Sequence, residues 1–541
     1  MWRRFLSICF LASSLVAASS EARPFRGSTK IHVLLCQSAD DGAALRTADY
    51  YRRLLFTPGN GGLADWWHDI SYVNFNNAGS EVHGWYRMSQ TTGQLQALNR
   101  SDKINACVEA ARTAPSGALT VPPGAIRYIV TSPGIDAFGW NGGAFMAFDF
   151  EVGLAVHEGG HGIGLNHTFS NNPDYRNVDW AAIGEYDDPW DAMSWANSYV
   201  ATTPFGAAPA ALVAPHLDRM GWLPRSRIAV HAANGASEAI YTLAATNHPE
   251  ASGALLVRVP FAPDDLFRYY TIEFIRKDRW SAGIPADTVL IHEVKRNRDA
   301  AGVPVGEQIA WLQRDLARAD KAPAQALDAN GVQIRVLSIN PATNQATVSV
   351  RSEMAARCLM GFVWREAQPG DLVCVPPAER AETRQENAEA ASRREPGGGA
   401  YGPNTCRSGF VWREAFDGDA VCVPPASRTR ARASNAQAGA RANPARIAYG
   451  PNTCQSGFVW READDVDWVC VSPAARQQAR DDNALASSRR QPGGGAYGPN
   501  TCDSGFVWRE AFPDDVVCVP PASRAAARAD NAAAPTRLMI P

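Results

Sequence analysis

Residues 157–167 read His-Glu-Gly-Gly-His-Gly-Ile-Gly-Leu-Asn-His. Four residues turn an α-helix through about 400°, so His157 and His161 project from the same face of a helix, one turn apart. Gly164 tolerates the positive φ at which a helix ends and the chain reverses, and this reversal brings His167 back toward the other two histidines. The stretch therefore predicts three imidazoles that converge at the end of one helix.

Three imidazoles are the ligand set of a zinc site that keeps its fourth position open, which is typical of catalysis. A zinc ion there lowers the pKa of bound water to about 7 and polarises a carbonyl group. Glu158 stands beside the ligands and is placed to act as general base and then acid in amide hydrolysis. We therefore expect Zn²⁺ held by His157, His161 and His167. Other histidines lack this spacing and are expected to be ordinary hydrogen-bonding groups: His68, His83 and His216.

A second motif follows the histidines, because residues 188–194 read Asp-Pro-Trp-Asp-Ala-Met-Ser. Together, the two motifs resemble the metzincin clan of zinc metallopeptidases, in which a methionine-bearing turn lies below the metal. Met193 is the candidate for that methionine. With residues 215–223, the turn is most similar to gametolysin-like and immune-inhibitor-A-like peptidases. The resemblance covers residues 157–223 well and 30–350 loosely.

The resemblance implies an α+β catalytic domain, with a mixed sheet and an active-site helix at about residues 151–162. It also implies a protein or peptide substrate. The sequence departs from some metzincins at Trp195, where they carry a tyrosine that ligates zinc, so we expect a three-histidine site without that tyrosine. A first strand at residues 31–35, close to the N-terminus, makes latency through a propeptide unexpected.

The pattern around the helix predicts further strands. Residues 126–130 form a compact apolar run, and residues 142–148 are expected to form an edge strand just before the helix. Such an edge would pair an extended peptide beside the metal. The side chains of Phe145, Met146 and Phe148 are expected to belong to the core.

Beyond the predicted catalytic domain, residues 226–352 hold short apolar strands bounded by Gly, Pro, Asn and Asp, which is the pattern of a β-sandwich. Residues 269–274 and 289–293 also resemble the β-rich segment that follows the catalytic domain of those relatives. We expect an accessory domain that positions substrate or stabilises the enzyme.

The C-terminal part repeats itself every 48 residues. Each copy holds a Gly-Phe-Val-Trp-Arg-Glu-Ala run and two cysteines, which predicts four β-hairpins, each stapled by its own disulfide, over residues 353–541. The segments 393–404 and 428–446 are expected to be partly ordered linkers, in which Ala and Arg permit short helices. A tryptophan in each copy serves as the hairpin's own core or, alternatively, as a stacking surface for a carbohydrate or cell-surface ligand: Trp364, Trp412, Trp460 and Trp508.

Composition fits an exported protein. Residues 1–22 have the cationic start, the apolar run and the small residues of a signal peptide, and the run is shorter than a bilayer span. Beyond Cys9 the number of cysteines is even, and we expect a Cys36–Cys107 disulfide, with Cys36 as a zinc-blocking thiol the alternative. A net charge of −3 gives no reason to expect nucleic acid as a partner.

The sequence thus predicts a secreted zinc endopeptidase, extracellular or periplasmic. Its expected parts are a signal peptide (1–22), a catalytic domain (23–225), a β-sandwich (226–352) and four repeats (353–541). The Asn166 sequon adjoins a zinc ligand, where a glycan would crowd the metal, so a bacterial origin is expected. Two alternatives remain open. One is a surface- or carbohydrate-binding protein that acts through its repeats, and the other is a zinc amidase that acts on cell-wall peptides.

Overall fold

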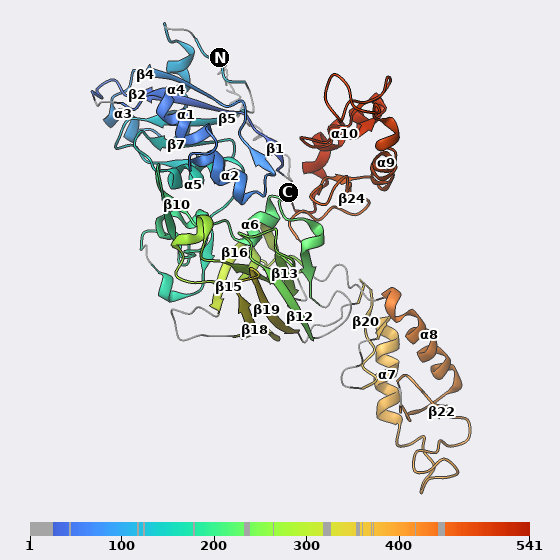
Figure 1. Ribbon diagram of the computed structural model, residues 1–541. Coiled ribbons are helices and arrows are strands. Elements are labelled where there is room, and N and C mark those ends of the chain that lie inside the picture. Colours follow the sequence, from blue (N-terminus) through green and yellow to red (C-terminus); the bar gives the residue numbers. More distant parts are fainter. Residues whose placement is uncertain are drawn as a thin grey trace, which may run out of the picture.

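The computed structural model is drawn in Figure 1, with an N-terminal α/β part, a β-rich middle part and two small C-terminal lobes. The predicted signal peptide lies outside the described residues. None of the helices in the described part of the chain is long and apolar enough to span a membrane. The structure describes residues 25–540 except 43–44, 116–117, 123–124, 177–178, 232–237, 263–264, 317–325, 353–357, 360, 369–370, 372, 417 and 442–449.

A five-stranded mixed sheet forms the centre of the N-terminal part. The strand order is β4 (Glu81–Arg87), β2 (Ile31–Gln37), β5 (Ile126–Thr131), β7 (Gly143–Ala147) and β6 (Phe138–Trp140). All neighbours are parallel except β6 and β7. Mixed α/β architecture, expected from the sequence, is therefore confirmed.

Alternation along β2 explains how helices cover both faces of this sheet. Val33 and Leu35 pack in one core with α1 (Ala48–Phe56), α2 (Leu63–Ile70) and α5 (Val152–Gly162). Leu34 and Cys36 point the other way, into a core with α3 (Thr92–Ala97) and α4 (Arg100–Arg112). Cys36 is bonded to Cys107 of α4, so the disulfide was predicted correctly and the thiol alternative was wrong.

One strand prediction was wrong. Residues 142–148 were expected to form an edge strand, but β7 lies between β5 and β6, and β6 is the edge. The chain makes a tight antiparallel hairpin first, pairing Phe138 with Phe145. Phe145 and Met146 are buried, as expected, and Phe148 is partly buried against the core.

A β-sandwich forms the middle part, as predicted. Its two sheets enclose a core of apolar side chains that includes Val257, Ile272 and Val348. One sheet has the order β11 (Ile228–Val230), β13 (Leu256–Pro260), β14 (Tyr269–Ile275), β15 (Thr288–Arg298), β16 (Pro304–Leu316) and β8 (Phe169–Ser170). The other has the order β12 (Glu238–Ala244), β19 (Gln345–Ser352), β18 (Val332–Asn340) and β17 (Ala326–Ala329).

Smaller elements complete these two parts. They are β1 (Gly27–Ser28) paired with β3 (Phe75–Asn76), β9 (Val200–Thr203) paired with β10 (Gly206–Pro209), α6 (Ala214–Arg219), and 3₁₀ helices η1 (Pro173–Tyr175), η2 (Ala192–Asn197), η3 (Arg225–Arg227) and η4 (Arg279–Gly283).

The α/β part and the sandwich share buried contacts. Asp218 of α6 and Arg258 of β13 form a buried ion pair, with nitrogen and oxygen 2.6 Å apart.

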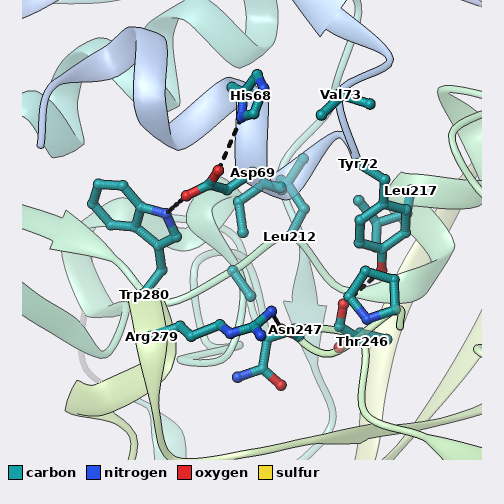
Figure 2. Close-up of a pocket in the computed structure, with 13 residues that line it drawn as sticks. His68, Asp69, Tyr72, Val73, Leu212, Leu217, Thr246, Asn247, Arg279 and Trp280 are labelled. Atoms are coloured by element: carbon teal, nitrogen blue, oxygen red, sulfur yellow. Dashed lines mark hydrogen bonds and ion pairs between the residues drawn. The ribbon is translucent and has the colours of Figure 1, made fainter. Parts of the chain in front are cut away.

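A pocket of about 360 Å³ lies at the same junction, between α2 and η4 (Figure 2). In Figure 2, Asp69 accepts hydrogen bonds from His68 and Trp280, which closes one side of the pocket. The polar groups drawn there hold the two parts together.

Each repeat is a hairpin closed by a disulfide, as predicted, and then a helix. In every repeat the two bonded cysteines are 16 residues apart. The hairpins are β20–β21 (Val363–Trp364, Cys374–Val375), β22–β23 (Val411–Trp412, Cys422–Val423), β24–β25 (Val459–Trp460, Cys470–Val471) and β26–β27 (Val507–Trp508, Cys518–Val519). The helices are α7 (Pro377–Glu389), α8 (Pro425–Arg441), α9 (Pro473–Ala484) and α10 (Pro521–Ala533). A 3₁₀ helix, η6 (Ser487–Arg489), follows α9, and another, η7 (Ala534–Arg537), follows α10.

Repeats pack as pairs, which the sequence did not predict. Arg365 of the first repeat donates to the carbonyl oxygen of Ala415 in the second, at 3.0 Å. Arg461 of the third donates to that of Ala511 in the fourth, at 3.1 Å. The two pairs form the two separate lobes of Figure 1. Of the two predicted linkers, 428–446 is helix up to Arg441, within α8, whereas 393–404 forms turns.

The second pair is bonded to the rest of the chain through side chains. Arg26 pairs with Asp464 at 2.7 Å, and Arg225 donates to the carbonyl oxygen of Asp467 at 2.8 Å. The indole N–H of Trp468 donates to the carbonyl oxygen of Leu223 at 3.2 Å. This lobe is thus anchored beside the end of the α/β part.

Candidate metal centre

The three predicted histidines converge. His157 and His161 lie on α5, and Gly164 has a φ of 90°, which lets the chain turn back so that His167 faces them. One ligand nitrogen from each ring lies within 4.8 Å of the others, and the Nε2 atoms of His161 and His167 are 3.0 Å apart. Two ligands of a tetrahedral zinc ion are about 3.3 Å apart, so this spacing suits such an ion.

A hydrogen bond on the far side of each ring fixes its orientation. The Nδ1 atom of His157 lies 3.1 Å from the carbonyl oxygen of Ala192, and that of His161 lies 2.8 Å from the carbonyl oxygen of Leu165. Since a carbonyl oxygen only accepts, Nδ1 carries the proton in both rings. The Nε2 lone pairs are thereby left to face the centre of the cluster.

Burial keeps these rings neutral. The pKa of His157 and of His167 is lowered to about 3, mainly by burial and then by the neighbouring imidazole of His161. The pKa of His161 is lowered as well, again mainly by burial. Neutral imidazoles with free lone pairs are what a divalent metal requires.

Glu158 is buried next to the first ligand. Burial raises its pKa to about 7, while the positive charge of Arg100 and a hydrogen bond from the backbone N–H of Gly139 oppose the rise. A carboxyl group with a pKa near neutrality both takes up and releases protons at physiological pH, as a general base and acid must. Gly139 belongs to β6, so the edge strand passes directly over the candidate base.

Met193 packs against α5 at Gly160. A side chain at Gly160 would meet the Met193 sulfur at 2.5 Å, so the glycine is what allows the close approach. The Asp191 carboxylate holds this turn by accepting from the backbone N–H of Met193 at 2.6 Å and from Nδ1 of His216 at 3.1 Å. His216 is therefore a hydrogen-bonding group, as expected.

Trp195 takes no part in the cluster. Its ring lies against Gly153 at the start of α5, where an added Cβ would meet it at 2.1 Å. A tyrosine from another segment does reach the cluster, because Tyr186 places its hydroxyl 2.9 Å from Nε2 of His167. That nitrogen faces the other two ligands.

Two site residues, Glu185 and Tyr186, were missed from the sequence. The Glu185 carboxylate lies 2.7 Å from Nδ1 of His167 and orients the third ring. Tyr186 has a φ of 61°, which is rare for a residue with a large side chain. The Gly-Glu-Tyr segment at 184–186 was a weak signal of a tight turn, but nothing in it indicated proximity to His167.

We expect Glu185→Ala to weaken zinc binding about 10- to 100-fold, since residues that orient a ligand contribute this much to affinity. Titration with a competing chelator measures the dissociation constant. Glu109→Ala is the matched control, because Glu109 is an exposed carboxylate paired only with Arg112 of its own helix. An unchanged affinity in Glu185→Ala would show that His167 needs no anchor.

Comparisons with protein-family models and with curated proteins found no match to this chain. The function is therefore argued from the geometry of the site.

Proposed function

We propose that this protein is a metzincin-like zinc endopeptidase. The observation that carries the proposal is the convergence of three neutral imidazoles beside a buried carboxyl group with a pKa near 7. The five disulfides fit an extracellular location, and secretion by a bacterium is part of the proposal. Its first test is cleavage of an unfolded protein substrate that stops when a chelator removes metal and returns with zinc.

His157, His161 and His167 would hold the ion. Bound there, zinc would supply a Lewis acid for the scissile carbonyl and would lower the pKa of water. Glu158 takes the proton from the attacking water and returns it to the leaving nitrogen. Its burial and the hydrogen bond from Gly139 hold its carboxyl group in place during both transfers.

The edge strand β6 is the proposed guide for substrate. Among the described strands it has only β7 as a neighbour, so its outer side is open to a further strand, while the N–H of Gly139 already donates to Glu158. An extended peptide adds to such an edge through main-chain hydrogen bonds. Because Gly139 of β6 contacts the Glu158 carboxyl, a peptide on this edge lies next to the base.

Tyr186 is the proposed donor to the substrate carbonyl oxygen. A metal held by His167 would use its Nε2 lone pair, which would free the Tyr186 hydroxyl from that nitrogen. The hydroxyl can then donate to an oxygen that gains negative charge in the transition state.

We expect Tyr186→Phe to lower kcat about 100-fold while KM and zinc content stay the same, because a single donor to a developing oxyanion contributes about this much. Steady-state kinetics and metal analysis measure these quantities. Tyr175→Phe is the control, since its hydroxyl bonds to Asp315 at 2.5 Å and lies outside the histidine cluster. Equal kcat in Tyr186→Phe and wild type would remove the hydroxyl from the mechanism.

The repeats favour a second, binding role. Trp412 and Trp508 are half-buried and donate their indole N–H groups within their own repeats, as core residues do. Yet Tyr401 and Tyr497 stand beside them with three quarters of their surface exposed, and each tyrosine–tryptophan pair is edge-on at about 6 Å. Two such aromatic pairs are suited to stack on sugar rings, so we propose that the repeats bring the peptidase to a carbohydrate surface.

A further inference from the structure

A second group of metal-binding side chains lies at the far edge of the central sheet. His32 is on β2, and Glu81 and His83 are on the edge strand β4. His32 is paired with Glu81 in the parallel register, and residues two apart on a strand share a face. The three side chains therefore project from the same face, across two strands.

Their spacing matches the edge of a zinc tetrahedron. Nδ1 of His32 lies 3.4 Å from Nε2 of His83, and that nitrogen lies 3.3 Å from a Glu81 carboxylate oxygen. Ligands at 2.0–2.2 Å from a tetrahedral ion are about 3.3–3.5 Å apart. All three ligand atoms fit within 4.8 Å of one another, as the atoms of the α5 site do.

We propose that His32, Glu81 and His83 form a second metal site, which takes a borderline divalent cation such as Zn²⁺. Two imidazoles and one carboxylate are a known donor set for this ion, and a water would complete the tetrahedron. The donor set differs from that of the α5 site, because here the carboxylate of Glu81 is itself a ligand.

The surroundings of the cluster support a structural role. His32 is buried, whereas Glu81 is about half exposed, so the site opens to solvent on one side. Lys30 pairs with the other Glu81 oxygen at 2.5 Å, which leaves one oxygen toward His83. The lysine charge repels a cation, so this site is expected to bind more weakly than the α5 site.

A metal at this position would join two strands. Within the described sheet, β4 has β2 as its only neighbour, and the register of the pair shifts between Leu35 and Cys36. Ligands from both strands would hold the edge in place beside this irregularity, and the bound metal would raise the unfolding temperature.

Zinc stoichiometry in the full chain tests the proposal. After equilibration with zinc at a buffered free concentration, we expect two ions per wild-type chain, one in His83→Ala, one in His161→Ala and none in the double variant. Equal zinc in wild type and His83→Ala would overturn the second site. If the α5 site held no zinc, wild type and His161→Ala would both hold one ion and His83→Ala none, which separates this proposal from the enzymatic one.

Two further measurements guard against a folding artefact. Glu81→Gln, at an exposed position, is expected to bind zinc at least about tenfold more weakly in the His161→Ala background, since it replaces a direct ligand. Zinc is expected to raise the unfolding temperature of His161→Ala but not of the double variant.

His68→Ala is the control, because His68 is an exposed histidine beside a carboxylate, and it should leave zinc content unchanged. Unaltered affinity in Glu81→Gln would contradict the assigned ligand set.

Discussion

We expect Glu158→Gln to lower kcat/KM for peptide cleavage about 100- to 10,000-fold, which is the usual contribution of a general acid–base residue, and to leave one zinc ion at the α5 site. The amide has nearly the shape of the carboxyl group and still accepts from the N–H of Gly139, but it cannot take up a proton at neutral pH. Because Glu158 is no ligand in the proposed site, metal content should not change. Kinetics on a peptide substrate and metal analysis of the same sample check both statements.

The matched control is Glu151→Gln. Glu151 immediately precedes the same helix, and its carboxylate accepts from the backbone N–H of Ala207 at 3.1 Å, which an amide oxygen also does. We expect its activity to stay within about twofold of wild type, as for a substitution away from the reacting groups. If Glu158→Gln cleaved as fast as wild type, the peptidase mechanism would be wrong and the binding role of the repeats would become the leading function.

Arg461→Ala is expected to destabilise the second repeat pair by about 3–5 kcal/mol, the typical result of breaking a buried ion pair on one side. Arg461 is 2% exposed and forms two bonds of 2.7 and 2.9 Å with Asp467. It also donates to the carbonyl oxygen of Ala511 in the next repeat, so its loss leaves a buried carboxylate and separates the two hairpins. Hydrogen exchange of residues 450–540 in the full chain measures the change.

Arg480→Ala supplies the comparison. Arg480 pairs with Glu462 of the same repeat, but its side chain is 53% exposed, so the pair is expected to contribute less than about 1 kcal/mol. Equal protection in Arg461→Ala and Arg480→Ala would mean that the repeats are held by their disulfides alone.

Local geometry explains which site residues could be predicted. His157 and His161 are one helical turn apart, and Gly164 permits the reversal that His167 requires, so the spacing alone indicated convergence. Tyr186 depends on the unusual φ of its own backbone and on a loop beyond the motif, and neither leaves a pattern in the sequence.

Local signals also explain which parts of the fold could be predicted from the sequence. Short apolar strands bounded by Gly, Pro, Asn and Asp in residues 226–352 predicted a sandwich, because strands and the turns between them are local signals. The edge strand was misassigned because β6 has only three residues, Phe138–Trp140, too few for any periodicity. Pairing of the repeats rests on Arg365 and Ala415, which are 50 residues apart, so the identity of the copies gave no hint of it.

The segment after the third ligand ties the two large parts together. Two residues beyond His167 the chain enters β8, which pairs with β16 of the sandwich, and the Phe169 and Trp311 rings stack at 4.6 Å. His292, also from the sandwich, pairs with Asp188 just before the Met193 turn. A gene fragment ending near residue 225 would therefore lack the partner strand of its own ligand loop. The α/β part and the sandwich are expected to fold only when they are expressed together.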